Sequence, residues 1–144
     1  MMDMNLLFNL GNLLVIPFWL IMIVLPRWGW VVWVIRSPWI AAPPALIYAA
    51  LVLPQVGSLL LALSQPSLGS VAALLGSPGG ATVGWMHFLA FDLFVGRWVY
   101  LDAIERKIHP LVMAPILFFV FMLGPIGLLV YLITRMIFLR VERR

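Results

Sequence analysis

The sequence predicts an all-α integral membrane protein, a four-helix bundle whose spans are interrupted by proline and glycine. Of its 144 residues, 65% are hydrophobic and only 10% are charged, whereas soluble domains are about 45–50% apolar and about 25% charged. The chain also contains four predominantly apolar runs close to the ~20 residues that a helix needs to cross the hydrocarbon core. We therefore expect one membrane domain, residues 1–144, with the lipid bilayer as its partner.

The four spans are predicted at residues 6–25, 39–63, 82–101 and 111–134. Proline and glycine can kink a membrane helix, line a cavity or relieve packing. Three spans contain such residues: Pro17 in the first, Pro54 and Gly57 in the second, and Pro115 and Gly124-Pro125-Ile126-Gly127 in the fourth. We expect kinked helices at these positions.

The segments between the spans are short. Val31–Ile35 is apolar and flanked by arginines, so we expect it to lie along the membrane surface or to dip into it. Gln65–Ala81 is an uncharged loop with a predicted short helix at Leu68–Leu75, and Thr82 is the predicted cap of the third span. The first apolar run has no basic region before it and no cleavage pattern, so we expect a retained span without a transit peptide.

Several classes of protein and site are excluded by composition. A net charge of +4 in so apolar a chain indicates contact with lipid headgroups and not with nucleic acid. The absence of cysteine excludes disulfides and thiolate metal sites. The chain has no phosphate-binding loop, no Gly-x-Ser-x-Gly and no His/Asp cluster at metal-ligand spacing. We therefore expect no metal site and no required cofactor.

The predicted topology leaves the orientation undecided. Four crossings would place both termini on one side of the membrane. The orientation rule compares lysines and arginines near the span ends on the two sides. Both sides then carry four: Arg135, Arg140, Arg143 and Arg144 against Arg27, Arg36, Arg106 and Lys107.

The third span carries three ionisable residues, His87, Asp92 and Arg97. A charged side chain at the bilayer centre costs roughly 2.5–3.5 kcal/mol on insertion scales, so each is expected to be satisfied by a neighbouring helix or a ligand. At 100° per residue, the three point in three directions around the helix. We therefore expect protein or ligand on several sides of this helix, and the three do not form a local catalytic triad.

Each of the three has a functional and a structural interpretation. Asp92, near the middle of the span, is either a proton donor or a hydrogen-bonding group near the broken backbone at Pro54 or Pro125. His87 exchanges protons, ligates a porphyrin-type metal or is a satisfied interhelical histidine. Arg97 extends to the interface, pairs with an acid or contacts substrate.

Aromatic side chains surround these groups and suit a flat or polyene ligand. They also suit the packing of membrane bundles and interfacial belts. The candidate ligand-binding residues are Trp85, Phe91, Phe94, Trp98, Tyr100 and Asp102.

The third span contains a motif that resembles the signature of the abscisic-acid-deficient-four-type membrane proteins, which are associated with neoxanthin synthesis. The matching residues are Trp85-x-His87-x-x-Ala90-x-Asp92-Leu93-Phe94-x-x-Arg97-x-x-Tyr100-x-Asp102. The resemblance extends to Pro17-Phe18, Pro26 and Gly124-Pro125-Ile126-Gly127, and so to nearly the whole chain. It implies a four-helix membrane protein of xanthophyll metabolism, here a bacterial-type member, with His87, Asp92, Arg97 and Asp102 in the polar motif.

Two functions are compatible with this resemblance. The first is carotenoid or xanthophyll handling, with a cofactor-free isomerisation or epoxide rearrangement in which Asp92 is the general acid and His87 or Arg97 assists. The alternative is a small accessory subunit of a pigment-binding or photosynthetic complex, in which other membrane subunits are partners and His87 binds chlorophyll. A structural scaffold for biosynthetic enzymes is a third option. The expected ligand is a carotenoid or another isoprenoid, and the expected location is a bacterial cytoplasmic or photosynthetic membrane.

Overall fold

The computed structural model describes residues 3–142, with side chains through residue 139, and all regular elements in this part of the chain are helical. The all-α prediction is therefore confirmed. The elements are α1 (Met4–Val24), α2 (Gly29–Arg36), η1 (Pro38–Ala41), α3 (Ala42–Val52), η2 (Leu53–Gln55), α4 (Val56–Ser64), α5 (Leu68–Leu75), α6 (Pro78–Glu105) and α7 (Pro110–Glu142).

Three helical segments are long and apolar enough to cross a membrane: Met4–Val24, Pro38–Ser64 and Pro110–Leu139. They support the prediction of a membrane protein. Helix α6, which contains the predicted third span, is not among them, because His87, Asp92 and Arg97 interrupt its apolar sequence.

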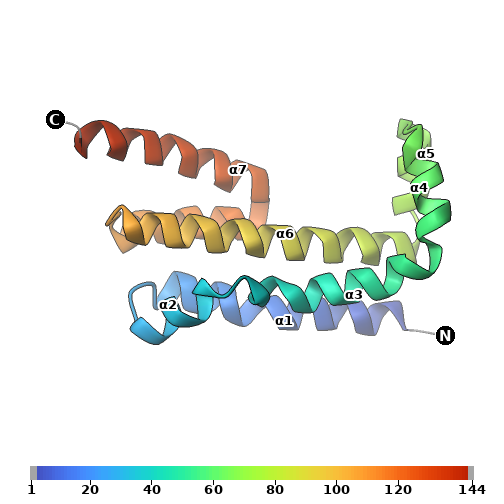
Figure 1. The fold of residues 1–144 in the computed structure, drawn as a ribbon, viewed down its shortest axis with the longest axis horizontal. Coiled ribbons are helices and arrows are strands. Elements are labelled where there is room, and N and C mark those ends of the chain that lie inside the picture. The colour runs from blue at the N-terminus through green and yellow to red at the C-terminus, as the bar shows by residue number, and fades with distance from the viewer. Residues whose placement is uncertain (1–2, 143–144) are drawn as a thin grey trace.

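Helix α6 lies at the centre of the bundle and contacts α1, α3 and α7 along its length (Figure 1). Glycines allow α1 and α6 to approach closely. A Cβ atom on Gly96 would lie 2.2 Å from the ring of Trp19, and one on Gly11 would lie 2.2 Å from the end of Met86. Trp19 and Met86 are buried in the core.

Polar residues fix where the long helices begin. Asp3 caps α1 by accepting hydrogen bonds from the backbone N–H groups of Asn5 and Leu6. Ser77 caps α6 in the same way through Gly80, and Pro78 occupies the first turn, where its missing N–H is not needed. The predicted cap at Thr82 is therefore wrong, because Ser77 and Pro78 start the helix earlier. The Thr82 hydroxyl instead donates to the carbonyl of Pro78.

The predicted second span does not form one straight helix. It divides at η2, where Pro54 interrupts α3, and α4 and α5 stand across one end of the bundle (Figure 1). Helix α5 spans Leu68–Leu75, as predicted, and a reciprocal hydrogen-bond pair between Ser67 and Ser70 caps it. The break creates a corner between α3 and α4.

Helix α7 reverses direction in its middle. Its backbone departs from helical geometry at Leu123 and Gly124, and the chain folds back on itself (Figure 1). We call residues 110–122 the first arm and residues 125–142 the second arm. At ~1.5 Å per residue, a straight helix would carry Arg135 about 37 Å from Pro110, yet Arg135 bonds to Asp102, close to the start of the first arm.

This reversal changes the predicted topology. Four straight crossings would return the chain to the end at which it starts. Instead, the second arm runs toward the end of the bundle opposite the start of α1 (Figure 1). The fourth predicted span, 111–134, thus contains the turn, and the bundle differs from one of four straight helices.

Close packing of the two arms depends on Gly127. A Cβ atom there would lie 2.1 Å from the backbone nitrogen of Val120 and 2.4 Å from its Cα. We expect Gly127→Ala to destabilise the protein by about 1–3 kcal/mol, because backbone atoms cannot move aside as a flexible side chain can. Thermal unfolding of the purified protein in detergent measures the loss.

Gly57→Ala is the matched control, because no atom lies within 4 Å of a Cβ at that position in α4. We expect no loss of stability there, since alanine is favoured over glycine in helices by about 0.5–1 kcal/mol. Equal unfolding temperatures for the two variants would contradict the close contact between the arms.

Candidate functional site

A cavity of about 570 Å³ lies at the corner between α3, α4, α5 and the first turns of α6. This volume falls in the range of about 300–1,000 Å³ that is usual for ligand pockets, and such pockets combine apolar walls with a few polar groups. The apolar lining includes Val52, Leu59, Leu63, Leu74, Leu75 and Val83. The polar lining is Gln55, Ser58, Ser77 and His87, with the aromatic rings of Tyr48 and Phe88.

His87 lies at the edge of this cavity, on the exposed side of α6. Its ring centroid is 5.7 Å from that of Tyr48 on α3 and 4.7 Å from that of Phe91, one turn further along α6. The imidazole thus lies among aromatic rings and remains accessible to a ligand.

The exposed face of α6 continues from His87 as an aromatic stripe, formed by His87, Phe91, Phe94 and Trp98. Phe91, Phe94 and Trp98 are 59%, 47% and 38% exposed. The second arm of α7 borders the far end of the stripe, where Trp98 meets Tyr131 edge to face at 5.6 Å. Protein therefore covers α6 on several sides, as predicted, but leaves the stripe open to lipid or ligand.

Asp92 lies on another side of α6, against the turn between the arms of α7. A Cβ atom on Gly124 would lie 2.5 Å from Asp92 Oδ1, so the carboxyl group packs directly against this glycine. The half-buried carboxyl group makes no hydrogen bond to any residue between 3 and 139. Asp92 is thus near Pro125, as the structural interpretation predicted, but without the predicted hydrogen bond.

Arg97 reaches a third element. Its Nη2 donates to the carbonyl oxygen of Arg36 at the end of α2, and its guanidinium carbon lies 6.0 Å from the centroid of the Phe94 ring. A cation at the end of a helix satisfies a free carbonyl group and interacts favourably with the helix dipole. The contact is therefore with a helix end and not with an acid.

The structure does not bring His87, Asp92 and Arg97 together. His87 faces α3 and the cavity, Asp92 faces the turn of α7, and Arg97 faces the end of α2. Their helical spacing predicts this divergence. The three side chains therefore do not form one compact cluster.

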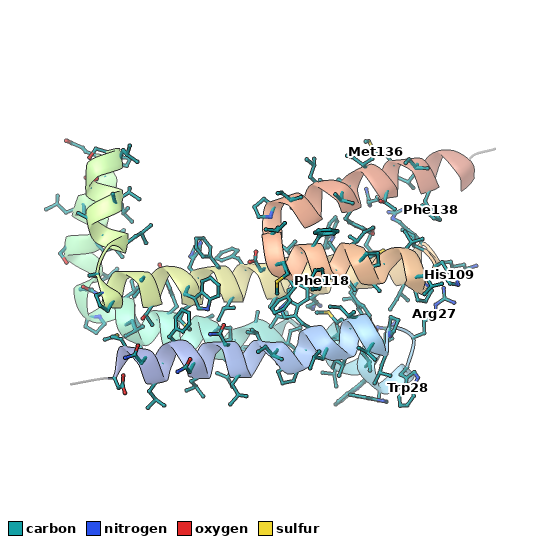
Figure 2. The ribbon with its side chains drawn as sticks, turned by 180° about the vertical axis from the view of Figure 1, so that it is seen from behind. Arg27, Trp28, His109, Phe118, Met136 and Phe138 are labelled. Carbon is teal, nitrogen blue, oxygen red and sulfur yellow. The ribbon has the colours of Figure 1, made fainter. Side chains whose placement is uncertain are left out.

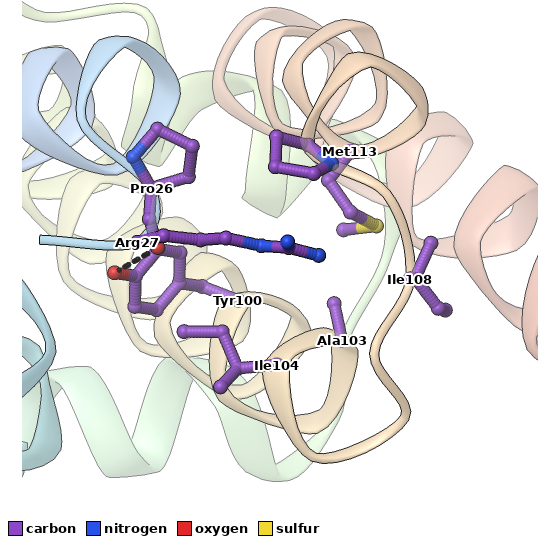
Figure 3. A pocket seen from close by; sticks show the side chains of 8 residues that line it. Pro26, Arg27, Tyr100, Ala103, Ile104, Ile108 and Met113 are labelled. Atoms are coloured by element: carbon purple, nitrogen blue, oxygen red, sulfur yellow. Dashed lines mark hydrogen bonds between the residues drawn. The ribbon is translucent and has the colours of Figure 1, made fainter.

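Three of the predicted ligand-binding residues, Trp85, Tyr100 and Asp102, form hydrogen bonds with other parts of the protein. Trp85 donates its indole N–H to Oδ1 of Asn12, at 2.9 Å, and stacks on Phe8 of α1. The buried Tyr100 donates its hydroxyl to the carbonyl of Pro26, at 2.7 Å (Figure 3). Tyr100 also lines a cavity of about 20 Å³, which is enough for roughly one water molecule.

Asp102 organises a polar cluster at the end of α6. Its Oδ2 accepts from Arg106 Nε at 2.8 Å, from Arg135 Nε at 2.9 Å and from the Tyr131 hydroxyl. Asp102 lies just beyond the predicted span 82–101, toward the loop. Burial raises the pKa of its carboxyl group, but the three hydrogen bonds outweigh burial and lower the pKa to about 2.

Comparison with known proteins gives the family. A profile of the ABA DEFICIENT 4-like family matches residues 6–131. The chain belongs to this family. The same comparison found no curated protein and no solved structure that matches the chain. Membership confirms the predicted resemblance and fits a membrane protein associated with carotenoids or xanthophylls.

The candidate residues on α6 of this ABA DEFICIENT 4-like chain therefore form two groups in space. His87, Phe91, Phe94 and Trp98 form the open stripe, while Trp85, Tyr100 and Asp102 hold other elements against α6. Sequence analysis missed the cavity residues Tyr48, Gln55, Ser58 and Ser77. Their one signal was the Pro54 interruption, which indicated either a cavity or relief of packing.

We expect Asp102→Asn to destabilise this family member by about 2–3 kcal/mol, because two arginines and a tyrosine lose a charged acceptor. Unfolding in detergent measures the change. Glu105→Gln is the control, since this exposed acid on the next turn makes no salt bridge to any residue through 139. Similar losses in both variants would mean that general charge, and not the Asp102 cluster, stabilises the fold.

Proposed function

We propose that this protein binds a carotenoid, or a related isoprenoid polyene, with one end group in the 570 Å³ cavity and the chain along the aromatic stripe. The observation that carries the proposal is the position of His87, which belongs to both the cavity lining and the stripe. A ligand could thus pass from one to the other without crossing a helix.

The chemistry of the two surfaces matches such a ligand. The cavity walls are apolar, and Gln55, Ser58, Ser77 and His87 could bind the hydroxyl or epoxide oxygen of a xanthophyll end group. From His87 to Trp98, the stripe rises about 16 Å along α6. Its aromatic rings would pack against the flat conjugated chain.

The membrane arrangement is part of the proposal. Helices α1, α3 and α6 and the two arms of α7 form the embedded bundle, and α4 and α5 close one end of it. The stripe would then face the hydrocarbon core, from which an apolar polyene can enter sideways. A bacterial cytoplasmic or photosynthetic membrane is the location that we propose.

The catalytic form of the proposal is a cofactor-free rearrangement of an epoxy xanthophyll. The Asp92 carboxyl group would protonate the epoxide oxygen, a C–O bond would break, and a neighbouring carbon would lose a proton to the carboxylate. The product is an isomer of the substrate, so no oxidant or cofactor is needed. The half-buried Asp92 supports this role because its oxygens make no hydrogen bond within residues 3–139.

In this reaction His87 and Arg97 would assist from a distance. His87 would bind the oxygen of an end group or exchange protons, and Arg97 would provide positive charge near Phe94. Asp92 follows His87 by five residues, which is about 7.5 Å along α6 but on another side of the helix. The ligand would therefore have to reach past the edge of the stripe toward the turn of α7.

A second function is supported by the exposure of His87 and of the stripe. An accessory subunit of a pigment complex would present such a surface to chlorophyll or to another subunit, with His87 as the magnesium ligand. The pigment content of protein extracted mildly from its native membrane separates the two functions. Stoichiometric chlorophyll together with other subunits favours the accessory role.

Filling the cavity tests the binding proposal. Ala62 on α4 lines the cavity, and we expect Ala62→Trp to reduce retention of an epoxy xanthophyll by the purified protein about tenfold or more, equal to about 1.4 kcal/mol. Ala72→Trp is the matched control, because Ala72 is exposed on α5 and does not line the cavity. Absorption of the co-eluting carotenoid measures retention. Equal retention in both variants would exclude the cavity.

Removing the acid tests the reaction. We expect Asp92→Asn to lower product formation from an epoxy xanthophyll by about 10²-fold or more, the usual contribution of a general acid, while ligand retention is kept. Asp3→Asn is the control, because asparagine also caps helices well and Asp3 is far along the chain. Chromatography of the products measures the rate. Unchanged product formation by a folded Asp92→Asn variant would remove Asp92 from the mechanism.

A further inference from the structure

All the lysine and arginine side chains that the structure describes lie at one end of the molecule, which we call the basic end. They come from α2, α6, α7 and the loops after α1 and α6. The residues are Arg27, Arg36, Arg97, Arg106, Lys107 and Arg135. The sequence separates them by up to 108 positions, and the fold brings them together.

Direct contacts establish this grouping. Arg27 shares the small cavity with Ala103 and Ile108, and its side chain extends across Tyr100 toward the loop after α6 (Figure 3). Arg97 bonds to the backbone of Arg36, and Arg106 and Arg135 share Asp102. Figure 2 shows Arg27, Trp28 and His109 at one end of the bundle. Phe138, on the second arm, lies toward the same end.

The opposite end carries no basic side chain within residues 3–139. Helices α4 and α5, the turns beside them and the start of α6 are uncharged from Val56 to Met86. Asp3, the cap of α1, is the charged residue at that end. The two ends of the bundle therefore differ sharply in charge.

The positive charge of the basic end is not neutralised internally. Six cations face two acids there, Asp102 and Glu105, when side chains through residue 139 are counted. Asp102 is already shared by Arg106 and Arg135. Arg27, Arg36 and Lys107 are exposed and form no salt bridge with an acid in that part of the chain.

Tryptophans accompany these cations. Helix α2 buries Val31 and Ile35 against the bundle and turns its tryptophans outward. The exposed set is Trp28, Trp30, Trp33 and Trp39, at 57%, 49%, 77% and 77% exposure. Tryptophan concentrates where hydrocarbon meets headgroups, beside lysine and arginine.

We propose that the basic end is a docking surface for anionic phospholipid headgroups of the cytoplasmic leaflet. Anionic lipids attract basic residues near the membrane surface, and cytoplasmic segments carry the excess of lysine and arginine. The sequence alone gave a tie of four against four for the two sides. The reversal in α7 removes this tie, because it places the second arm at the end that already holds Arg27, Arg36, Arg106 and Lys107.

The opposite end, with α4, α5 and the 570 Å³ cavity, then lies toward the other leaflet. This orientation is independent of the proposed ligand. It holds whether the cavity binds a carotenoid or another molecule, so the two proposals fail separately.

Lipid selectivity tests the docking surface. The full-length protein in mild detergent is incubated with equal amounts of phosphatidylcholine and phosphatidylglycerol, and the lipids that co-elute with it are quantified by mass spectrometry. Each headgroup-facing cation is expected to raise the affinity for an anionic lipid about fivefold. We therefore expect phosphatidylglycerol to be enriched over phosphatidylcholine at least about fivefold. Arg27→Gln/Arg36→Gln/Lys107→Gln should lose this enrichment.

The charge-preserving variant Arg27→Lys/Arg36→Lys/Lys107→Arg is the control and should retain it. Because Arg27 packs across Tyr100, the double variant Arg36→Gln/Lys107→Gln provides a second comparison with Arg27 intact, and it should lose part of the enrichment. Unfolding temperatures verify that each variant is folded. Equal binding of both lipids by the wild type, or enrichment kept in the neutral triple variant, would overturn the proposal.

Cysteine labelling tests the orientation. The native chain has no cysteine, so Asn5→Cys, Ser67→Cys and His109→Cys each provide a single thiol. In spheroplasts of a bacterial host, a membrane-impermeant maleimide should label Asn5→Cys and Ser67→Cys directly, and His109→Cys only after permeabilisation. Green fluorescent protein fused after Arg144 should fluoresce, as it does in the cytoplasm. Direct labelling of His109→Cys, or a C-terminus on the same side as Asn5, would overturn this orientation.

Discussion

The shared carboxylate of Asp102 holds the folded-back helix in place. Its Oδ2 accepts hydrogen bonds from Arg106 on the loop side and from Tyr131 and Arg135 on the second arm of α7. Because one partly buried charge satisfies three donors, the second arm is fixed at the end of α6. The position of the second arm, and with it of Arg135, depends on this cluster together with the close contact at Gly127.

The polar residues of α6 act as separate connections and not as one site. His87, Asp92, Arg97 and Asp102 contact α3, the turn of α7, the end of α2 and the second arm, respectively. A membrane helix with several polar groups must be matched by neighbours, since unsatisfied groups are costly in hydrocarbon. Trp85, Arg97, Tyr100 and Asp102 therefore connect α6 to other parts of the bundle, whereas His87 and Phe94 remain exposed.

The two ends of the molecule differ in charge and composition. One end combines exposed cations and tryptophans, while the other combines uncharged short helices with an apolar cavity. The aromatic stripe on α6 joins the two regions. Such an arrangement would orient the protein through its basic end and leave the cavity and the stripe accessible from the hydrocarbon core.

The sequence by itself determined the all-α membrane class, the family, the short helix at Leu68–Leu75 and the divergent directions of His87, Asp92 and Arg97. The family follows from the resemblance of the third-span motif, and the other features follow from composition, capping residues and helical spacing, which are local properties of the chain. Only the tertiary structure decided the reversal of α7, the cavity beside Pro54 and the grouping of the cations. Gly124-Pro125-Ile126-Gly127 marks an interruption in the sequence. Whether the helix kinks or folds back there depends on two contacts of the second arm. One is with Asp102, which is distant in sequence, and the other is with Val120 on the first arm.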